Sequence, residues 1–422
     1  MKTLLSLDIT KLQKGEFTDS GPAAWGHFRL SQISLALNAT APGINNYVVV
    51  SFDDGERWQP LRMNLPNCSI RDIDVRHGDL VVATHGRSFW VLDDLSPLRQ
   101  LDAAAAASEL ALFAPRPAVR LHAGGFQGTP EPKDEPMAEN PPLGATIDYF
   151  LKTDAPPPLT IEILDAGGDL VRRYSSDDKV QLPDPQRLRT TPDWVAVREA
   201  PSAAAGLHSF IWDLHYAAPR ELGSPAGGSR GSSGLWAPPG SYTVRVSAAG
   251  KSVARPLAVV RDPRLSSSVT DADLVLEFET ARGVQAERVR VAAAARQAES
   301  LRRQLADLRD GAKGAAAFAL DALAKAIDRV AGSPAAGGGE EGFEAAESSP
   351  TSLRQLASSL SGLQSAIESA DGTPTADALT GLVERRKLVA IGLRQWEEIL
   401  GTELPRANEA LEAAGLALLK TE

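Results

Sequence analysis

Two pairs of adjacent aspartates are the residues of this chain whose type best suits acid–base chemistry. The pairs are Asp53-Asp54 and Asp93-Asp94. Successive residues of a strand point to opposite faces of the sheet, so neighbouring carboxylates do not face the same substrate. An aspartate pair at a strand end is more typical of a turn, where carboxylates accept hydrogen bonds from backbone amides. We therefore assign no catalytic residue from the sequence.

A second place where chemistry is possible is the segment Thr84-His-Gly-Arg-Ser88. His85 and Arg87 are two residues apart, so on an extended strand both would face the same side and line a common channel. An arginine there can hold a carboxylate or a phosphate through two parallel hydrogen bonds. The alternative, which we favour, places both residues in a bulged loop between two strands. His85 and Arg87 are thus weak ligand-site candidates.

The rest of the sequence argues against cofactor and nucleic-acid binding. The single cysteine, Cys68, and the six histidines do not form a zinc-binding cluster. We find no glycine-rich phosphate loop for a nucleotide and no G-x-S-x-G elbow of a serine hydrolase. A net charge of −10 leaves no broad basic surface for a phosphate backbone. We expect no cofactor, no metal and no nucleic-acid partner.

The most specific motif is Ser51-x-Asp53-x-Gly55-x-x-Trp58, which follows the β-type run at residues 47–50. Asp53 can accept hydrogen bonds from the amides of a tight turn, and Ser51 can add a local bond. Gly55 can adopt the positive φ that such a turn needs. Trp58 supplies a large apolar side chain for packing. The motif therefore predicts a structural turn rather than a ligand site.

The elements that position these residues follow three compositions. Residues 1–100 hold short β-rich runs bounded by turn signals, which favour an antiparallel all-β region. Residues 101–143 are rich in alanine and proline, and we predict a connector there. Strand signals return over residues 144–264, in the number expected for an Ig-like β-sandwich. Within that region, the segment Asp165–Asp169 is typical of a hairpin turn.

Residues 267–422 change to a helical pattern. Thr270 and Asp273 have the spacing of a capping box at the start of a helix. Apolar residues then recur at steps of three and four in several stripes, separated by breaks at residues 333–342 and 371–374. The pattern predicts an antiparallel helical bundle whose stripes form its own core.

Several blocks resemble large bacterial proteins described as sortilin-like or BNR-repeat, glycosyl-hydrolase-like β-propellers. The S-x-D-x-G-x-x-W motif is similar to the Asp box of their blades, and residues 79–94 resemble their closing blade. Residues 206–216 and 237–246 resemble the Ig-like domain that follows the propeller. Residues 403–415 resemble the C-terminus of these proteins. The similarity extends over about nine tenths of the chain.

The resemblance implies a partial β-propeller over residues 1–100, made of an Asp-box blade and a closing blade. A closed propeller needs about four to eight blades of roughly 40 to 45 residues, so this region can supply two. We therefore expect a C-terminal part of a longer protein, able to self-associate through an open propeller edge. The family resemblance implies an extracytoplasmic location, although the first residues show no signal-peptide pattern. No apolar run is long enough for a membrane span.

The sequence therefore favours a multidomain β-plus-α protein that serves as a non-catalytic scaffold or interaction module for a protein or carbohydrate partner. The alternative is part of a xyloglucanase-like glycoside hydrolase whose catalytic blades are missing from this chain. Such enzymes need two carboxylates about 5 to 9.5 Å apart across a sugar-sized cleft. A third possibility is a proteolysis-prone fragment with no function of its own.

Overall fold

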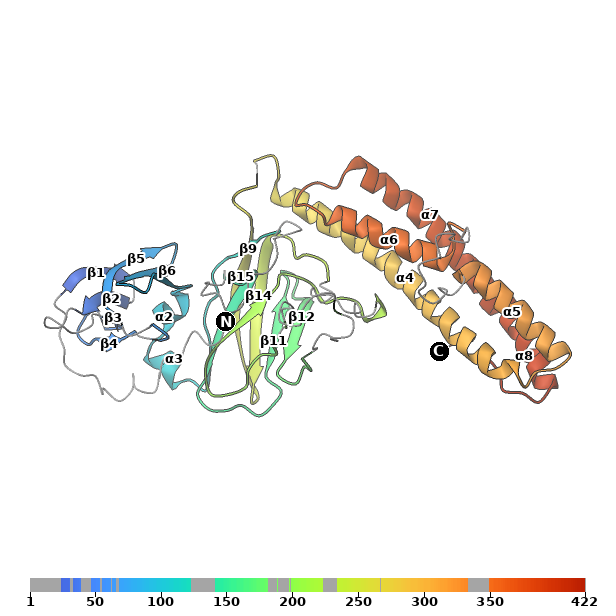
Figure 1. The fold of residues 1–422 in the computed structure, drawn as a ribbon, viewed down its shortest axis with the longest axis horizontal. Coiled ribbons are helices and arrows are strands. Elements are labelled where there is room, and N and C mark those ends of the chain that lie inside the picture. Colours follow the sequence, from blue (N-terminus) through green and yellow to red (C-terminus); the bar gives the residue numbers. More distant parts are fainter. Residues whose placement is uncertain are drawn as a thin grey trace. The chain divides into compact units, whose positions relative to one another are not determined.

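The structure is a computed structural model of the 422-residue chain. It describes residues 24–30, 33–38, 47–53, 55–61, 63–65, 68–122, 141–180, 188, 197, 199–222, 234–265, 267–332 and 349–421. The protein combines β-sheets with helices in two compact units (Figure 1). The first unit is built mainly from strands, and the second contains Leu265–Glu422 with short stretches that precede it.

Two antiparallel sheets lie at the start of the described chain. The first has the order β1-β2-β3-β4 and contains β1 (Ala24–Leu30), β2 (Ile33–Asn38), β3 (Tyr47–Ser51) and β4 (Gln59–Pro60). The second has the order β5-β6-β7 and contains β5 (Ile70–Arg76), β6 (Asp79–Thr84) and β7 (Phe89–Leu92). Each strand pairs with its neighbour in sequence, so both sheets are meanders.

One apolar core joins these two sheets. Its fully buried members come from β3, β5 and β6, from the segment after β4, from α2 (Ser96–Gln100) and from the residue before α2. They are Val48, Val50, Leu61, Ile70, Ile73, Leu80, Val82, Leu95 and Leu98. The alternation of buried and exposed side chains along β6 is the pattern of a strand with one buried face.

Two further sheets complete the first unit. The order β13-β10-β8 contains β8 (Leu110–Leu112), β10 (Ala145–Leu151) and β13 (Gly206–Trp212). The order β12-β11-β14-β15-β9 contains β9 (Ala118–Arg120), β11 (Thr160–Leu164), β12 (Leu170–Ser175), β14 (Gly240–Ala248) and β15 (Lys251–Arg261). The short helix α3 (Ala103–Ala107) precedes β8 in this unit, whereas η2 (Arg220–Leu222), which lies between β13 and β14 in the sequence, belongs to the second unit.

Part of the predicted connector, residues 101–143, is built into these sheets. β8 pairs with β10, and β9 pairs in parallel with β15. Leu110 and Leu112 are buried, so this short stretch has the apolar face that a strand needs. The proline-rich part of the segment lies within residues 123–140, outside the described residues.

The hairpin predicted at Asp165–Asp169 is confirmed. It joins the antiparallel strands β11 and β12. Asp165 Oδ1 accepts hydrogen bonds from the amides of Gly167 and Asp169, both at 2.9 Å. This aspartate therefore stabilises the turn through its side chain.

The second unit consists of helices that pack on one another. They are α4 (Asp271–Arg309), α5 (Ala315–Ala331), α6 (Leu353–Ile367), α7 (Ala376–Glu398), the π-helical segment η3 (Ile399–Glu403) and α8 (Leu404–Ala413). The capping box predicted at Thr270 and Asp273 is confirmed, with both reciprocal hydrogen bonds present. The predicted break at residues 371–374 separates α6 from α7, whereas residues 333–342 lie outside the described residues.

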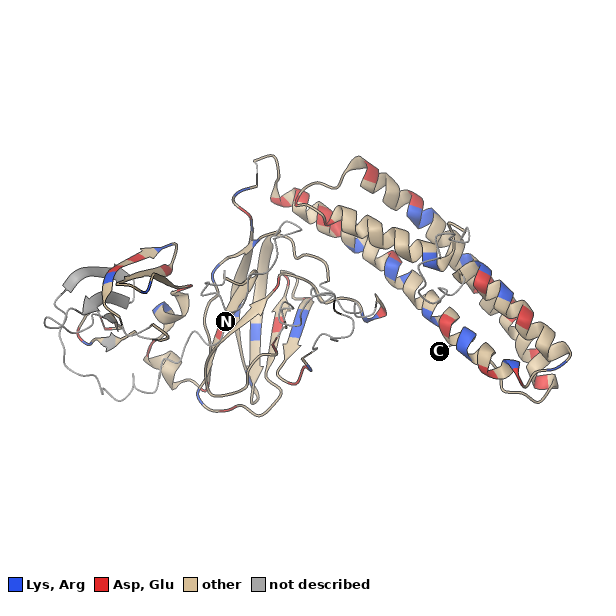
Figure 2. Ribbon diagram, in the orientation of Figure 1, with Lys and Arg blue, Asp and Glu red and all other residues tan. Residues whose placement is uncertain are grey.

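The predicted apolar stripes supply much of the core of the second unit. Most of their members are buried, among them Val291, Ala294, Ala298, Leu301, Leu320, Leu323, Ile327, Leu353, Leu356, Leu360, Val389 and Trp396. Gly392 allows α7 to approach the start of α6 closely, because an added Cβ would lie 2.5 Å from the Thr351 carbonyl oxygen. Acidic and basic residues are interspersed along the helices (Figure 2). None of the described helices has both the length and the hydropathy that a membrane crossing requires.

Candidate functional site

The residues of the Ser51-x-Asp53-x-Gly55-x-x-Trp58 motif lie at the turn between β3 and β4 and bond mainly to the turn itself. Ser51 Oγ donates to Asp53 Oδ1 at 2.8 Å and accepts from the Gly55 amide at 2.8 Å. Asp53 Oδ1 also accepts from the Arg57 amide at 2.8 Å. Gly55 has a φ of +94°, and its carbonyl accepts from Trp58 Nε1 at 2.9 Å. These are the bonds of a turn-stabilising motif.

The turn that joins β6 to β7 contains His85 and Arg87, and both side chains are exposed. Thr84 holds this turn, because its Oγ1 donates to the Ser88 carbonyl at 2.7 Å and accepts from the Arg87 amide at 3.1 Å. The His85 amide donates to the Ser69 carbonyl at 2.8 Å. The turn is therefore ordered by Thr84 and by backbone groups, and its two candidate ligand residues extend from it into solvent.

The second aspartate pair, Asp93-Asp94, forms the corner between β7 and α2. Asp94 has a φ of +56°, and its Oδ1 accepts from the Ser96 amide at 2.8 Å at the start of the helix. The Asp94 amide donates to Asp79 Oδ1 at 2.9 Å, and Arg116 Nη1 lies 2.8 Å from the same oxygen. Burial raises the pKa of Asp93, and the nearby Asp79 carboxylate adds to this effect. The hydrogen bonds give Asp94 a capping role.

The sequence reasoning missed a buried acid, Asp148 on β10. This residue is 5% exposed, and it lies opposite Ser209 on the paired strand β13. The Ser209 hydroxyl donates a short hydrogen bond to Asp148 Oδ1. Burial raises the pKa of Asp148 to about 6, and the Ser209 bond opposes this effect. A carboxylate that is enclosed in this way is poorly placed to contact a sugar substrate. The sequence signal that could have found it is an aspartate within an otherwise apolar strand, which indicates a buried acid.

The edge strand β7 exposes a row of apolar side chains. Among the described residues it pairs with β6 alone. Phe89 and Val91 are 72% and 51% exposed, whereas Trp90 and Leu92 face the core side of the sheet. The four residues of β7 include neither a charged residue nor a proline. An edge of this kind offers backbone hydrogen-bonding groups and apolar surface to another strand.

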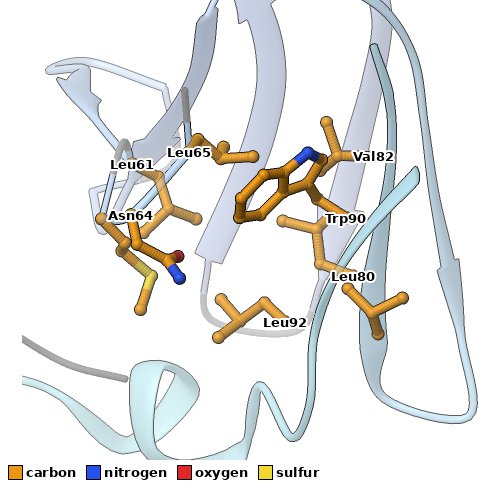
Figure 3. Close-up of a pocket in the computed structure, with 9 residues that line it drawn as sticks. Leu61, Asn64, Leu65, Leu80, Val82, Trp90 and Leu92 are labelled. Carbon is orange, nitrogen blue, oxygen red and sulfur yellow. The ribbon is translucent and has the colours of Figure 1, made fainter. Parts of the chain in front are cut away.

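The cavity behind β7 is small. Trp90 and Leu92 point from β7 toward Leu61 and Leu65, and Leu80 lies beside them (Figure 3). The cavity volume is about 30 Å³. That is room for roughly two water molecules, at about 10 to 15 Å³ each, and not for a sugar ring. The candidate functional site is therefore the exposed edge and face of β7 rather than the cavity.

The part of the chain that the structure describes contains no group of three or more His, Cys, Asp or Glu side chains placed to hold a metal ion. Asp54, the partner of Asp53 in the first aspartate pair, lies outside the described residues. Comparison of the chain with protein-family models, with curated proteins and with solved structures finds no match. The proposed function therefore depends on the geometry of the chain itself.

Proposed function

We propose that this chain is a non-catalytic interaction module that assembles through β7, by addition of a strand from a second copy. The observation that carries the proposal is the β7 edge, which has one side that no described strand pairs with and which contains no charged residue. Phe89 and Val91 expose large apolar side chains beside it. Strand addition would satisfy the backbone groups of the edge and place side chains of the added strand beside Phe89 and Val91 on the exposed face.

We further propose that residues 24–92 are two blades of an Asp-box β-propeller similar to the sortilin-like family. Propeller blades are four-stranded antiparallel sheets. The sheet β1-β2-β3-β4 has that number of strands, whereas β5-β6-β7 has three, and its two edge strands are β5 and β7. β5 carries charged residues along its length, whereas β7 carries none. The hydrogen bonds of Ser51, Asp53 and Gly55 support an Asp-box turn. On this proposal, the added strand occupies the place of a fourth blade strand.

The same family resemblance leads us to propose an Ig-like sandwich for the sheets that contain β8 to β15, and a helical bundle for α4 to α8. We propose that neither part forms the contact surface, because the exposed apolar edge of β7 lies outside both of them. The glycoside-hydrolase alternative has less support. The Asp94 carboxylate accepts a hydrogen bond from the Ser96 amide at the start of α2, and Asp148 is enclosed in its sheet.

The proposed association is weak. Full burial of an apolar side chain contributes about 1.5 to 3 kcal/mol, and Phe89 and Val91 are two such side chains on each partner. Association costs at least about 4 kcal/mol in lost translational and rotational freedom. The dimer should therefore depend on protein concentration.

Sedimentation velocity over a wide dilution series tests the proposal. We expect a species heavier than 44.7 kDa at high concentration and a 44.7 kDa monomer on dilution. A single monomer at every concentration would contradict assembly through β7. Turnover of xyloglucan or β-glucan that is lost when one acidic residue is neutralised would contradict the non-catalytic assignment.

A further inference from the structure

The segment Leu416–Thr421 follows α8 as an extended stretch of chain. α8 ends in a turn at Gly415, which has a φ of +68°. The Leu416 amide donates to the Leu411 carbonyl at 2.9 Å across this turn. This is the C-terminal capping pattern in which a glycine lets the chain leave the helix in a new direction.

Two side-chain amides hold the backbone of this extended segment. Asn408 on α8 bonds to both backbone groups of Leu419: its Oδ1 accepts from the amide at 2.8 Å, and its Nδ2 donates to the carbonyl at 3.0 Å. Gln304 on α4 does the same for Lys420, with bonds of 2.9 Å and 2.8 Å. Two consecutive residues are therefore recognised through their peptide groups, independently of their side chains.

One side chain of the segment is anchored. Leu419 is 3% exposed, whereas the adjacent Leu418 is 45% exposed, and Lys420 and Thr421 are also exposed. The contacts thus specify an extended backbone with one buried leucine. Proline is excluded at the anchor and at the next position, because both amides donate hydrogen bonds.

We propose that this seat, formed by Gln304, Asn408 and the surface that buries Leu419, is a docking groove for extended leucine-bearing peptides. The segment Leu416–Thr421 of the same chain is its cis occupant and excludes partners until it is displaced. Gly415 serves as the hinge, because glycine adopts both its present φ of +68° and the negative φ values of other backbone directions without steric cost. The proposal concerns the helical unit and does not depend on the association of β7.

The cis arrangement explains how the groove is regulated. A segment tethered next to its binding site has a high effective concentration, so a free peptide competes poorly with it. A change that weakens the cis segment without altering Gln304 or Asn408 should therefore open the groove. The double substitution Leu419→Ala and Lys420→Pro does this, because it removes the anchor and one amide donor.

The test is a fluorescence anisotropy titration of the full chain with a labelled peptide of the sequence Gly415–Thr421. We expect the double variant to bind the peptide at least about tenfold more tightly than the unaltered chain. Within the peptide, replacement of the leucine that corresponds to Leu419 by alanine should weaken binding at least about tenfold. The same change at Leu418 is the matched control and should alter binding less than about twofold. Equal losses from both changes, or equal binding by both chains, would overturn the proposal.

Hydrogen exchange of the unaltered chain provides a second test. It does not use the double variant and so does not depend on whether that variant folds. In the unaltered chain, excess unlabelled peptide should speed exchange of the Leu419 and Lys420 amides by displacing the cis segment. Asn408→Ala should speed exchange at Leu419 in the absence of peptide, because it removes the acceptor of that amide. Unchanged exchange of both amides in the presence of saturating peptide would overturn the proposal.

Discussion

Two edge strands of the first unit, β12 and β7, differ in how they are protected from pairing with another strand. β12 pairs with β11 on one side. On its other side, the Ala217 amide donates to the Val171 carbonyl at 3.0 Å, and Arg172 Nη1 donates to the Tyr216 carbonyl at 2.8 Å. Arg172 and Arg173 also place two positive charges on this strand. β7 has neither a charge nor a proline.

This difference indicates which of the two edges can pair with a strand of another chain. Natural sheets block their edges with charges, with proline or with a covering loop, because an open edge pairs with other chains. β12 combines a covering segment with two arginines, although Leu170 on it is 55% exposed. An edge strand can therefore expose an apolar side chain and still be protected from pairing with another strand. Among the described residues β7 has no covering segment, charge or proline, and this supports a binding role for that strand.

The exposure of Phe89 and Val91 could instead result from loose packing of the β5-β6-β7 sheet, and this would remove the contrast between β7 and β12. Ile73 under the β7 sheet and Ile163 in β11 beside β12 are both buried. Replacing either by alanine should lower the free energy of unfolding by about 2 to 5 kcal/mol, through lost burial and the cavity left behind. Urea denaturation measures both values. A loss below about 1 kcal/mol for Ile73→Ala would show that the open sheet is poorly packed.

The free energy of unfolding should depend on pH through Asp148, which lies outside the β5-β6-β7 sheet. Since burial raises the pKa of Asp148 from 3.8 to about 6, the folded state holds this proton more tightly than the unfolded state. The free energy of unfolding should therefore fall as pH rises from about 4 to 6, by about 3 kcal/mol. Asp148→Asn should remove this fall and raise stability at pH 7, with little effect at pH 3.

Thermal unfolding of Asp148→Asn and the unaltered chain across this pH range measures the effect. Because Asp148 lies on β10, outside the β5-β6-β7 sheet, Asp148→Asn should leave association through β7 unchanged at any given pH while the protein stays folded. Identical pH profiles for the two proteins would contradict the role given to Asp148.

The aspartate turns beside the two regions should contribute similar amounts of stability. Asp53 accepts hydrogen bonds from Ser51 and Arg57, and Asp165 accepts two from amides of its hairpin. Replacing either aspartate by alanine should cost about 1 to 2 kcal/mol of unfolding free energy. Asp53→Asn should cost less, because the side-chain oxygen is kept. If Asp53→Ala weakened binding of a partner but left the free energy of unfolding unchanged, this would instead indicate a ligand site at the turn.

The smallest expected effect is the removal of protection from β12. Arg172→Ala deletes the bond to the Tyr216 carbonyl and one edge charge, and it should lower stability by about 0.5 to 1.5 kcal/mol. Combined with Arg173→Ala, it should add weak association to that already present at β7. Sedimentation of the double variant measures this. No added association would show that the covering segment protects the edge without the arginines.

The parts of the fold that could be predicted from the sequence are those set by local patterns. The β-type run at residues 47–50 predicted β3, and the turn chemistry of Asp165 predicted the turn that joins β11 to β12. The capping box at Thr270 marked the start of α4. The range of β12 itself was not predicted, because its two central arginines interrupt the apolar pattern of a strand, and β8 was missed because it is only three residues long within an alanine-rich segment.

The candidate site was less predictable, because it depends on what lies beside each strand. The sequence Phe89-Trp90-Val91-Leu92 is apolar throughout, and such a run is typical of a strand covered on both faces. The exposure of Phe89 and Val91 follows from the absence of a neighbouring element at that place in the described structure. Burial of Asp148 is likewise set by tertiary packing. The bonds of Ser51 and Asp53, by contrast, span a few residues and follow from the motif itself.

The most direct test of the proposed β7 interface is a matched pair of lysine substitutions on the two edges. Val91 and Leu170 are similarly exposed, at 51% and 55%, so Val91→Lys and Leu170→Lys change similar surfaces. Sedimentation velocity at a concentration where the unaltered chain associates should show a monomer for Val91→Lys and unchanged association for Leu170→Lys. Association that survives Val91→Lys, or that is lost equally in both variants, would contradict assembly through β7.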